Sequence, residues 1–187
     1  MDVMTAVLSR RSEHHLVEPA PNDQEFAYLL RAAATALDHG SLRPWRLILV
    51  RDEGRVVLER CFADECAEPE SGRRQMVEGQ SAPLLATLVF SPIPHDSGRG
   101  SPIPEWEQLA ATSAMASSLT LLLHARGFGS VWCTGKFTES EQVRSVLGLN
   151  REERLLGWLC IGTPQRLTPS KRRVPEDVTD RISVFAP

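Results

Sequence analysis

One long apolar segment constrains the fold of this chain more than any other part of its sequence. Alanine, leucine and methionine occupy half of the positions from Glu105 to about Arg126, and Gly127 follows where such a helix would end. A helix that is apolar almost all round is typical of a buried element. Its small residues, from Ala111 to Ser118, would also let a second helix approach closely. The segment therefore predicts either a central helix or a subunit interface.

Four shorter apolar runs predict the strands that surround this helix. They are Trp45–Val50, Ala82–Phe90, Phe128–Gly135 and Leu155–Gly162. The run from Ala82 to Phe90 is nearly continuous, which is typical of a strand that is covered on both faces. Strands separated by helices, with no internal repeat, predict one domain of 187 residues with the α+β fold class, in which helices surround a central sheet.

Capping residues and the 3.6-residue period predict the remaining helices. Their expected starts are Asp2, Asn22 or Asp23, the turn before Val56, and Thr138. The first helix should carry Val3, Ala6 and Val7 on one face, and the second should extend its apolar stripe toward Leu37. Two irregular segments are also expected. Residues 67–80 are predicted to form a mobile surface segment or a frayed helix, and residues 91–104 a lid or an exchanged arm.

Charge and cysteine usage exclude several classes of protein. The formal net charge of −3 provides no broad basic field, so we expect no nucleic-acid partner. The four cysteines form no CxxC pair and no zinc spacing, so no metal site is predicted and a reducing cytoplasm is favoured. The N-terminal residues do not resemble a signal peptide, and no segment approaches the roughly 20 apolar residues of a membrane span. We therefore expect a soluble cytoplasmic protein.

The turn between the second helix and the first long strand has the composition of a ligand site. It runs from Asp38 through His39, Gly40, Ser41 and Arg43 to Pro44, and Trp45 then starts the strand. Polar groups beside an apolar wall are typical of cofactor pockets. An ordinary connection between a helix and a strand explains the same residues equally well at this stage.

Two basic clusters lie near opposite ends of the sequence. Arg10-Arg11-Ser12 follows the first predicted helix, and Lys171-Arg172-Arg173 lies near the C-terminus. Guanidinium groups and a hydroxyl can clamp a phosphate, because arginine presents a planar fork to the phosphate oxygens. The alternatives are an arginine pair that closes a helix C-terminus and a solvated basic tail.

These segments together resemble the flavin-dependent nitroreductase family, and above all its short bacterial members. The resemblance spans nearly the whole chain in the order of the family. Its motifs are Arg10-Arg11-Ser12, Glu18-Pro19-Ala20-Pro21, Leu30–Ala33, Asp38–Trp45, Trp106-Glu107-Gln108, Gly127-Phe128-Gly129, Trp132–Gly135, Leu159–Pro164 and Lys171–Glu176. Many family members have Gln and Asn where this chain has Arg43 and Ser41.

The resemblance implies a three-layer sandwich with a mixed, mostly antiparallel sheet, and a homodimer that binds FMN at the subunit interface. It implies that Arg10, Arg11 and Ser12 grip the phosphate or ribityl end, and that Lys171 and Arg173 close on the phosphate. Thr35 and His39 would reach the flavin from the partner subunit. Trp132, Cys133 and Thr134 would line the isoalloxazine ring, although a buried strand cysteine is usually inert packing.

The resemblance also implies an oxidoreductase that passes hydride from NADH or NADPH through FMN to a nitroaromatic, a quinone or a similar small acceptor, in a ping-pong sequence. No catalytic side chain is required, because the flavin carries out the hydride chemistry. A non-catalytic flavin-binding dimer on the same scaffold is the alternative, since a fold does not fix a function. A phosphate-recognising regulator that uses the same basic clusters is a third possibility.

Overall fold

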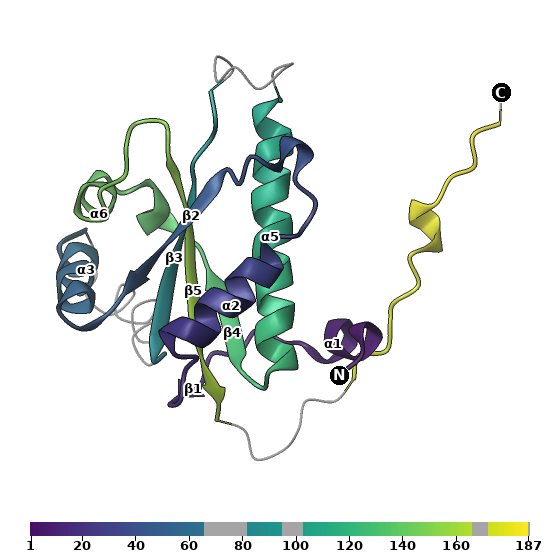
Figure 1. Cartoon of the computed structure of the whole chain (residues 1–187), viewed down its shortest axis with the longest axis horizontal. Coiled ribbons are helices and arrows are strands. Elements are labelled where there is room, and N and C mark those ends of the chain that lie inside the picture. The colour runs from purple at the N-terminus through teal and green to yellow at the C-terminus, as the bar shows by residue number, and fades with distance from the viewer. Residues whose placement is uncertain (66–81, 95–102, 166–171, 187) are drawn as a thin grey trace.

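The computed structural model of the chain describes residues 1–65, 82–94, 103–165 and 172–186. Its helices and strands alternate along the chain as the sequence predicts (Figure 1). The α-helices are α1 (Val3–Ser9), α2 (Asp23–Ala33), α3 (Asp52–Glu65), α5 (Glu105–Ala125) and α6 (Glu141–Val146). The strands are β1 (Leu16–Val17), β2 (Trp45–Val50), β3 (Leu84–Phe90), β4 (Gly129–Cys133) and β5 (Arg154–Pro164). Short 3-10 turns are η1 (His39–Ser41), η2 (Lys136–Glu139) and η3 (Thr179–Arg181).

The strands form one sheet around β5, the longest strand. β5 pairs along one edge with β3, which also pairs with β2, and along its other edge with β4, while β1 pairs with its last two residues. Each of these strand pairs is antiparallel, and a parallel bridge joins Ser12 to Ser130 at the start of β4. The sheet is therefore mixed and mostly antiparallel, as predicted.

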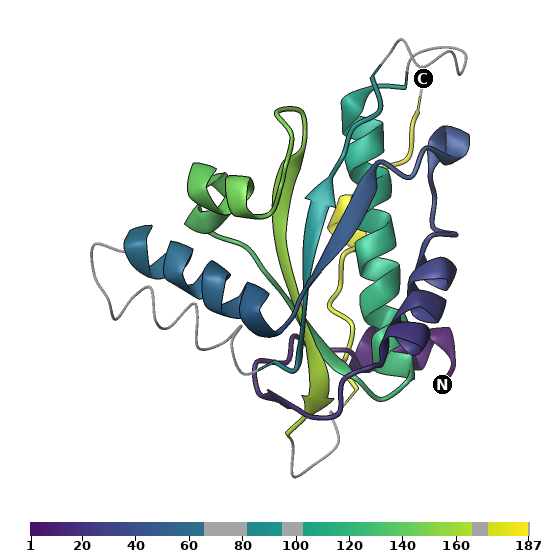
Figure 2. The ribbon, with the colours of Figure 1, turned by 60° about the vertical axis from the view of Figure 1, so that its left-hand side comes forward.

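Helices cover both faces of the sheet, which gives the three layers of the predicted sandwich (Figures 1 and 2). α2 and α5 lie on one face, where Phe26 and Leu29 of α2 and Met115 of α5 pack against alternate residues of the strands. α3 and α6 lie on the other face, where Leu58 and Val143 pack against the sheet. The two hydrophobic cores meet at the sheet, where neighbouring strand residues face opposite cores, as Leu84 and Leu85 do.

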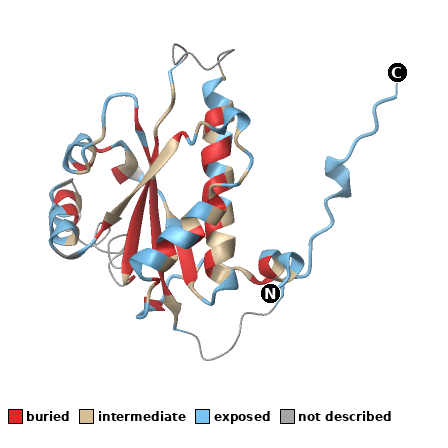
Figure 3. Cartoon of the chain, in the orientation of Figure 1, coloured by how far each residue is buried: buried red, intermediate tan, exposed pale blue. Residues whose placement is uncertain are grey.

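The strand β3 lies at the centre of both cores. All seven of its residues are buried, which confirms the strand covered on both faces that the apolar run predicts. Figure 3 shows this buried centre and the exposed outer surfaces of the helices. Burying an aliphatic side chain stabilises a fold by about 1.5–3 kcal/mol. The buried side chains of β3 therefore contribute strongly to the stability of both layers of packing.

The long helix α5 is buried on one face only. The side that packs on the sheet includes Ala111, Met115 and Leu119, whereas Ser113 and Ser117 are exposed and Trp106 is 70% exposed. The predicted all-round burial is therefore not reached within one chain. Among the helices that the structure describes, α5 included, none combines the length and apolar character needed to cross a membrane.

Capping residues explain where the helices begin. The Asp2 carboxylate accepts from the Thr5 backbone N–H at 3.0 Å, and the Asn22 side chain accepts from Glu25 N–H at 2.9 Å. α2 ends at Ala33, and Leu37 is 89% exposed, so the apolar stripe does not extend as far as predicted. In α1 the predicted apolar face is only partly buried, because Ala6 is covered while Val3 is 76% exposed.

The predicted cap of α6 is wrong. Ser140, not Thr138, caps this helix, because its hydroxyl accepts from Val143 N–H at 3.0 Å. The Thr138 hydroxyl instead donates to the Gly135 carbonyl within η2. Both residues carry a hydroxyl group and precede α6. The 3-10 turn η2 contains Thr138, which leaves Ser140 at the position directly before the helix.

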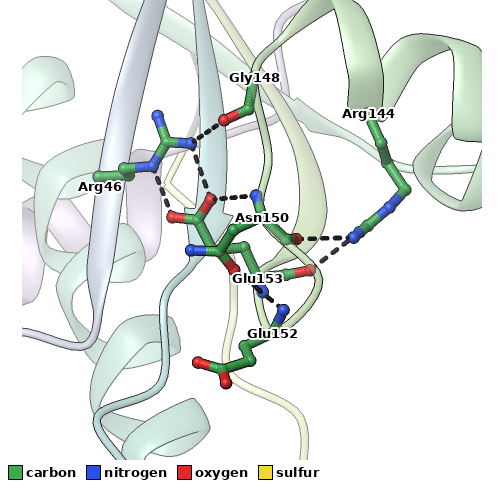
Figure 4. A network of polar contacts seen from close by, with 6 residues as sticks. All are labelled: Arg46, Arg144, Gly148, Asn150, Glu152 and Glu153. Atoms are coloured by element: carbon green, nitrogen blue, oxygen red, sulfur yellow. Dashed lines mark hydrogen bonds and ion pairs between the residues drawn. The ribbon is translucent and has the colours of Figure 1, made fainter.

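An ion pair closes the edge of the sandwich where β5 begins (Figure 4). Arg46 of β2 donates to both oxygens of Glu153, from Nε at 2.6 Å and from Nη2 at 2.9 Å. The Asn150 backbone N–H also donates to Glu153, at 3.0 Å. Glu153 is 4% exposed, and the hydrogen bonds from Arg46 lower its pKa to about 2 against the cost of burial. Such a bidentate pair fixes the loop that leads into the central strand.

The C-terminal residues 172–186 form an arm that runs outside the sandwich beyond α1 (Figures 1 and 2). Every residue in this range is exposed. Its large apolar side chains are Val174, Val178, Ile182, Val184 and Phe185. The predictions for residues 67–80 and for the middle of 91–104 fall mainly outside the described residues.

Candidate functional site

The two basic clusters, far apart in the sequence, meet at Leu8 in the last turn of α1. The backbone N–H of Arg173 donates to the Leu8 carbonyl at 2.8 Å. Arg11 Nη1 donates to the same carbonyl at 2.9 Å and to the Arg10 carbonyl at 3.0 Å. A helix C-terminus leaves such carbonyls without helical partners, and these two arginines satisfy them. The arm therefore brings its basic cluster beside Arg10 and Arg11.

The guanidinium groups at this junction have different roles. Arg11 bonds helix carbonyls, which is the helix-closing role that the sequence left open. Arg10 is half-buried and Arg173 is exposed, and neither side chain has an ion-pair partner within the described part of the chain. Arg172 lies close enough to Asp2 for its charge to lower the pKa of that carboxyl, after the larger effect of the Thr5 hydrogen bonds. Lys171 lies outside the described residues.

Ser12 connects this basic junction to the sheet. It forms the parallel bridge with Ser130, and the Glu13 N–H donates to the Ser130 carbonyl at 3.1 Å. From Ser130, β4 runs to Cys133, and Thr134 follows it on the surface. Three residues of a strand extend about 10 Å. The predicted phosphate residues and the predicted ring residues therefore lie at the two ends of one short strand.

The predicted ring residues Trp132 and Cys133 point in different directions. Trp132 is 36% exposed, and its Nε1 donates to the Leu156 carbonyl at 2.9 Å. The Cys133 thiol packs against the core on the α3 and α6 side, where its Sγ lies 3.9 Å from Sγ of Cys160. The Cys133 side chain is therefore half-buried against this core, which agrees with the packing role that the sequence allows.

Gly157 holds β4 and β5 at this close approach. Its φ is +118°, and a Cβ atom at this position would lie 2.2 Å from the Cys133 carbonyl oxygen. The register of β5 against β3 shifts at the same place, so Leu156 is an extra residue whose carbonyl faces Trp132. A glycine within an apolar strand often marks such a bulge. The glycine within the apolar run Leu155–Gly162 is therefore a sequence signal for this bulge.

The other predicted residues, Thr35 and His39, lie in the segment after α2. The Thr35 hydroxyl donates to the Ala32 carbonyl at 2.8 Å and the residue is exposed. His39 Nδ1 lies 2.8 Å from Glu107 Oε2 in the first turn of α5, and the His39 side chain is 71% exposed. Glu107 is thus a site candidate that the sequence analysis quoted only as part of a motif.

The loop after His39 has an uncommon backbone. Ser41 and Arg43 both have a φ of +51°, which is uncommon for residues other than glycine. Asp38 holds the loop in this shape, because its carboxylate accepts from Arg43 N–H at 2.7 Å and its carbonyl accepts from Ser41 N–H at 3.0 Å. Backbone strain of this kind concentrates at functional sites, which favours a ligand-binding role for the loop.

Buried Gln108 supports the same end of α5. Its Oε1 accepts from the Ile93 N–H at 2.8 Å, and its Nε2 donates to the carbonyls of Ile93 and Ile103. Gln108 therefore holds Ile93, after β3, and Ile103, before α5, at the same end of the helix. No sequence signal marked it, since a glutamine within an apolar helix could equally face solvent.

The two groups of predicted residues lie at opposite ends of α5. His39 contacts Glu107 in the first turn, whereas α1 contacts the last turn through His124. Seventeen helical residues separate these contacts, a distance of about 26 Å at 1.5 Å per residue. Within one chain, the structure therefore brings Arg10, Arg11, Ser12 and Arg173 together and keeps Thr35 and His39 away from them.

A cavity of about 510 Å³ lies elsewhere, at the edge of the sheet near β1. Its lining residues include His15, Val17, Glu18, Arg55, Pro83 and Gln165. None of the predicted site residues lines it, so it does not coincide with the candidate site.

The fold and these two regions define the class of this protein. It is a three-layer α+β protein whose candidate ligand-binding groups lie at the two ends of one long, half-exposed helix.

Comparisons with known proteins identify the family. The model of the Nitroreductase family matches residues 7–163. The "Putative NAD(P)H nitroreductase YdjA" of Escherichia coli K12 is 29% identical over 185 residues, covering 99% of this chain and all of that protein. A "Putative NAD(P)H nitroreductase" of Haemophilus influenzae is 27% identical, covering 93% of this chain and 95% of that protein.

Solved structures agree with this assignment. A nitroreductase-like family protein from Bacillus cereus superposes with a TM-score of 0.80 and 26% identity, covering 99% of this chain and 96% of that one. A mutant of NfnB, an FMN- and NADPH-dependent nitroreductase from sphigopyxis sp. strain HMH, shares the fold with a TM-score of 0.76 and 19% identity over 99% of both chains. The chain belongs to the Nitroreductase family.

Proposed function

We propose that this protein is an FMN-dependent oxidoreductase that takes electrons from NADH or NADPH and passes them to a small acceptor such as a nitroaromatic or a quinone. Membership of the Nitroreductase family supports the proposal, as do the names of the relatives, which specify NAD(P)H. NfnB, which has the same fold, is an FMN-dependent nitroreductase, and this supports FMN as the cofactor. We also propose that the protein works in the cytoplasm.

The observation that carries the proposal is the hydrogen bond from Arg173 to Leu8. It joins the arm to the last turn of α1, two residues before Arg10. The phosphate group of FMN carries between one and two negative charges near neutral pH. Two guanidinium groups without ion-pair partners among the described residues suit such a headgroup, because each offers a planar set of N–H donors.

The residues around this junction fit the rest of the flavin. Ser12 and Arg11 lie next to Arg10, and β4 leads from Ser12 toward Trp132, Cys133 and Thr134. We propose that the ring lies along this end of β4, against the Trp132 side chain and the backbone of the next two residues. When bound, FMN supplies the hydride chemistry, so the side chains have only to bind and orient it. Lys171 is proposed as a further phosphate contact.

We propose that two copies of the chain form the functional unit. The apolar side chains of the arm are exposed in the single chain, and so is the outer side of α5. Exposed apolar groups of this extent favour an interface. Thr35 and His39 of one copy would then meet the basic junction of the other, since about 26 Å of α5 separates the two regions within one chain.

A double substitution tests the phosphate assignment. Arg10→Ala with Arg173→Ala should give a folded, colourless protein, because the headgroup loses two cations that form no ion pair with the described residues. Visible absorbance of the purified protein measures the bound flavin, and circular dichroism checks the fold. The matched control is Arg31→Ala with Arg60→Ala, two exposed arginines whose removal changes the net charge equally. Full retention of FMN by the first variant would contradict the assignment.

A second measurement separates an oxidoreductase from a protein that only binds flavin. The yellow colour of the wild-type protein should bleach when NADH or NADPH is added without oxygen, and return when a quinone or a nitroaromatic is added. A protein that keeps its colour under both donors would be a flavin-binding protein without this activity.

A further inference from the structure

A serine and a histidine, neither of which belongs to the predicted site, join α1 to α5 immediately before the arginine pair. Ser9 is the last residue of α1 and is 8% exposed, and His124 lies in the last turn of α5. His124 Nε2 lies 2.7 Å from the Ser9 Oγ. The two residues are far apart in the sequence, so this contact exists only in the folded chain.

The direction of this hydrogen bond follows from the second contact of Ser9. The Ser9 hydroxyl lies 2.6 Å from the Thr5 carbonyl oxygen, which can only accept. A hydroxyl has one proton, so Ser9 donates it to Thr5 and receives a hydrogen bond from Nε2–H of His124. His124 is therefore a fixed donor toward the end of α1.

The rest of α1 provides little anchoring of its own. Of its seven residues only Ala6 and Ser9 are buried, while Val3, Met4 and Val7 are largely exposed. Leu8, whose carbonyl receives both Arg173 and Arg11, directly precedes Ser9. The Ser9–His124 hydrogen bond therefore helps to hold this short helix against α5, and the position of Arg10 depends on that of the helix.

We propose that His124 is a positioning residue for the phosphate end of the flavin site. It acts through Ser9, by holding the last turn of α1 where Arg10, Arg11 and the arm can converge on one phosphate. The proposal rests on the proposed function, since it assumes that this junction binds the FMN phosphate. It predicts that the Ser9–His124 bond contributes to the affinity for the phosphate group and not to the affinity for the ring.

Riboflavin distinguishes the two contributions, because it carries the same ring and lacks the phosphate. We would titrate the flavin-free, full-length protein with FMN and with riboflavin, following flavin fluorescence. His124→Phe keeps a ring of similar size without the donor and should weaken FMN binding by about five- to tenfold, the equivalent of one hydrogen bond. Riboflavin binding should change less than about twofold, within the scatter of such comparisons.

Three further variants make the test specific. His124→Gln restores an N–H donor and should recover most of the FMN affinity. Ser9→Ala should weaken FMN binding at least as much as His124→Phe, and the double variant should lose no more than Ser9→Ala alone, because each single change already removes the Ser9–His124 hydrogen bond. The control is Glu25→Ala, which removes the acceptor of the hydrogen bonds from Arg126 that tie α5 to α2 at the same end of the helix. It should leave FMN binding unchanged.

The outcomes are separable. Equal loss of FMN and riboflavin in His124→Phe, or no loss of either, would overturn the positioning role while leaving the proposed function intact. A wild-type protein that binds riboflavin as tightly as FMN would instead overturn the phosphate assignment and this inference with it. If His124→Phe does not fold, Ser9→Ala supplies the same comparison.

Discussion

At the scale of single residues, Gly157 carries the sharpest constraint near the candidate site. A side chain there would meet the backbone of Cys133 rather than a flexible neighbour, and its φ of +118° is unfavourable for any other residue. The Cys133 carbonyl oxygen cannot move away by a change of rotamer, as a side-chain atom could. The close approach of β4 and β5, and with it the orientation of Trp132, therefore depends on the absence of a Cβ atom.

Gly157→Ala should lower the free energy of unfolding by about 3 kcal/mol, through backbone strain and the contact with Cys133. Gly148→Ala is the matched control, because Gly148 also has a positive φ, +64°, but has nothing within 4 Å of the added Cβ. It should cost only about 1 kcal/mol. Urea denaturation measures both, and equal losses would show that the contact with Cys133 does not matter.

The residue scale also shows what a sequence can reveal. The hydroxyl residues before α6 and the glycine in β5 are visible as residue types, but their roles depend on partners elsewhere. Thr138 and Ser140 are both plausible caps, and the 3-10 turn selects Ser140. Gly157 becomes necessary only because Cys133 lies opposite. The Ser9–His124 bond has no sequence signal at all, since nothing local links the two residues.

At the scale of elements, the prediction succeeds where the pattern is local. The apolar segments predict the strand β3 and the helix α5, and both elements form because burial dominates their energetics. The predicted burial is complete for β3, whereas α5 is buried on one face. The burial of α1 was predicted less well, because a seven-residue helix takes its position from its neighbours rather than from its own periodicity. The polar connection into β5 depends on the same kind of tertiary partner, Arg46 on β2.

The Arg46–Glu153 pair gives this connection a pH dependence. The folded pKa of Glu153 is about 2, below the ordinary value of 4.5, so the carboxylate stabilises the fold above pH 4.5 and loses this contribution as the pH falls toward 2. The contribution is on the order of 2–3 kcal/mol.

Glu153→Gln should therefore be less stable than the wild type at neutral pH, and the difference should shrink as the pH falls from 4.5 toward 2. Chemical denaturation of both proteins at several pH values measures this difference, which cancels the titration of the other acidic groups. A difference that stays constant over this range would mean that the pair contributes nothing through the charge of Glu153.

At the scale of the whole molecule, the exposed arm and the half-exposed α5 point to a second copy. The sequence offered a central helix or a subunit interface as alternatives for α5. In the single chain, α5 is a helix with one face on the sheet and the other open. The apolar residues of the arm have no comparable cover either, as Val178 and Ile182 are 58% and 72% exposed.

Val178→Asp with Ile182→Asp should weaken the association of two chains by at least about 100-fold, because each aliphatic side chain contributes roughly 1.5–3 kcal/mol when buried. Analytical ultracentrifugation over a range of concentrations measures the change. The control is Val56→Asp with Val146→Asp, which adds the same charge to exposed valines of α3 and α6. A wild-type protein that sediments as one chain at all concentrations would refute the dimer.

The hydrogen bond between Arg173 and Leu8 has a consequence for the order of events during folding. Every helix and strand from α1 to β5 precedes Arg173 in the sequence, and the residues of the arm are exposed. The core therefore contains no described residue of the arm, and its packing does not require the hydrogen bond that joins the arm to α1. Under the proposed phosphate assignment, the site for the flavin headgroup is complete only when the arm has docked on α1.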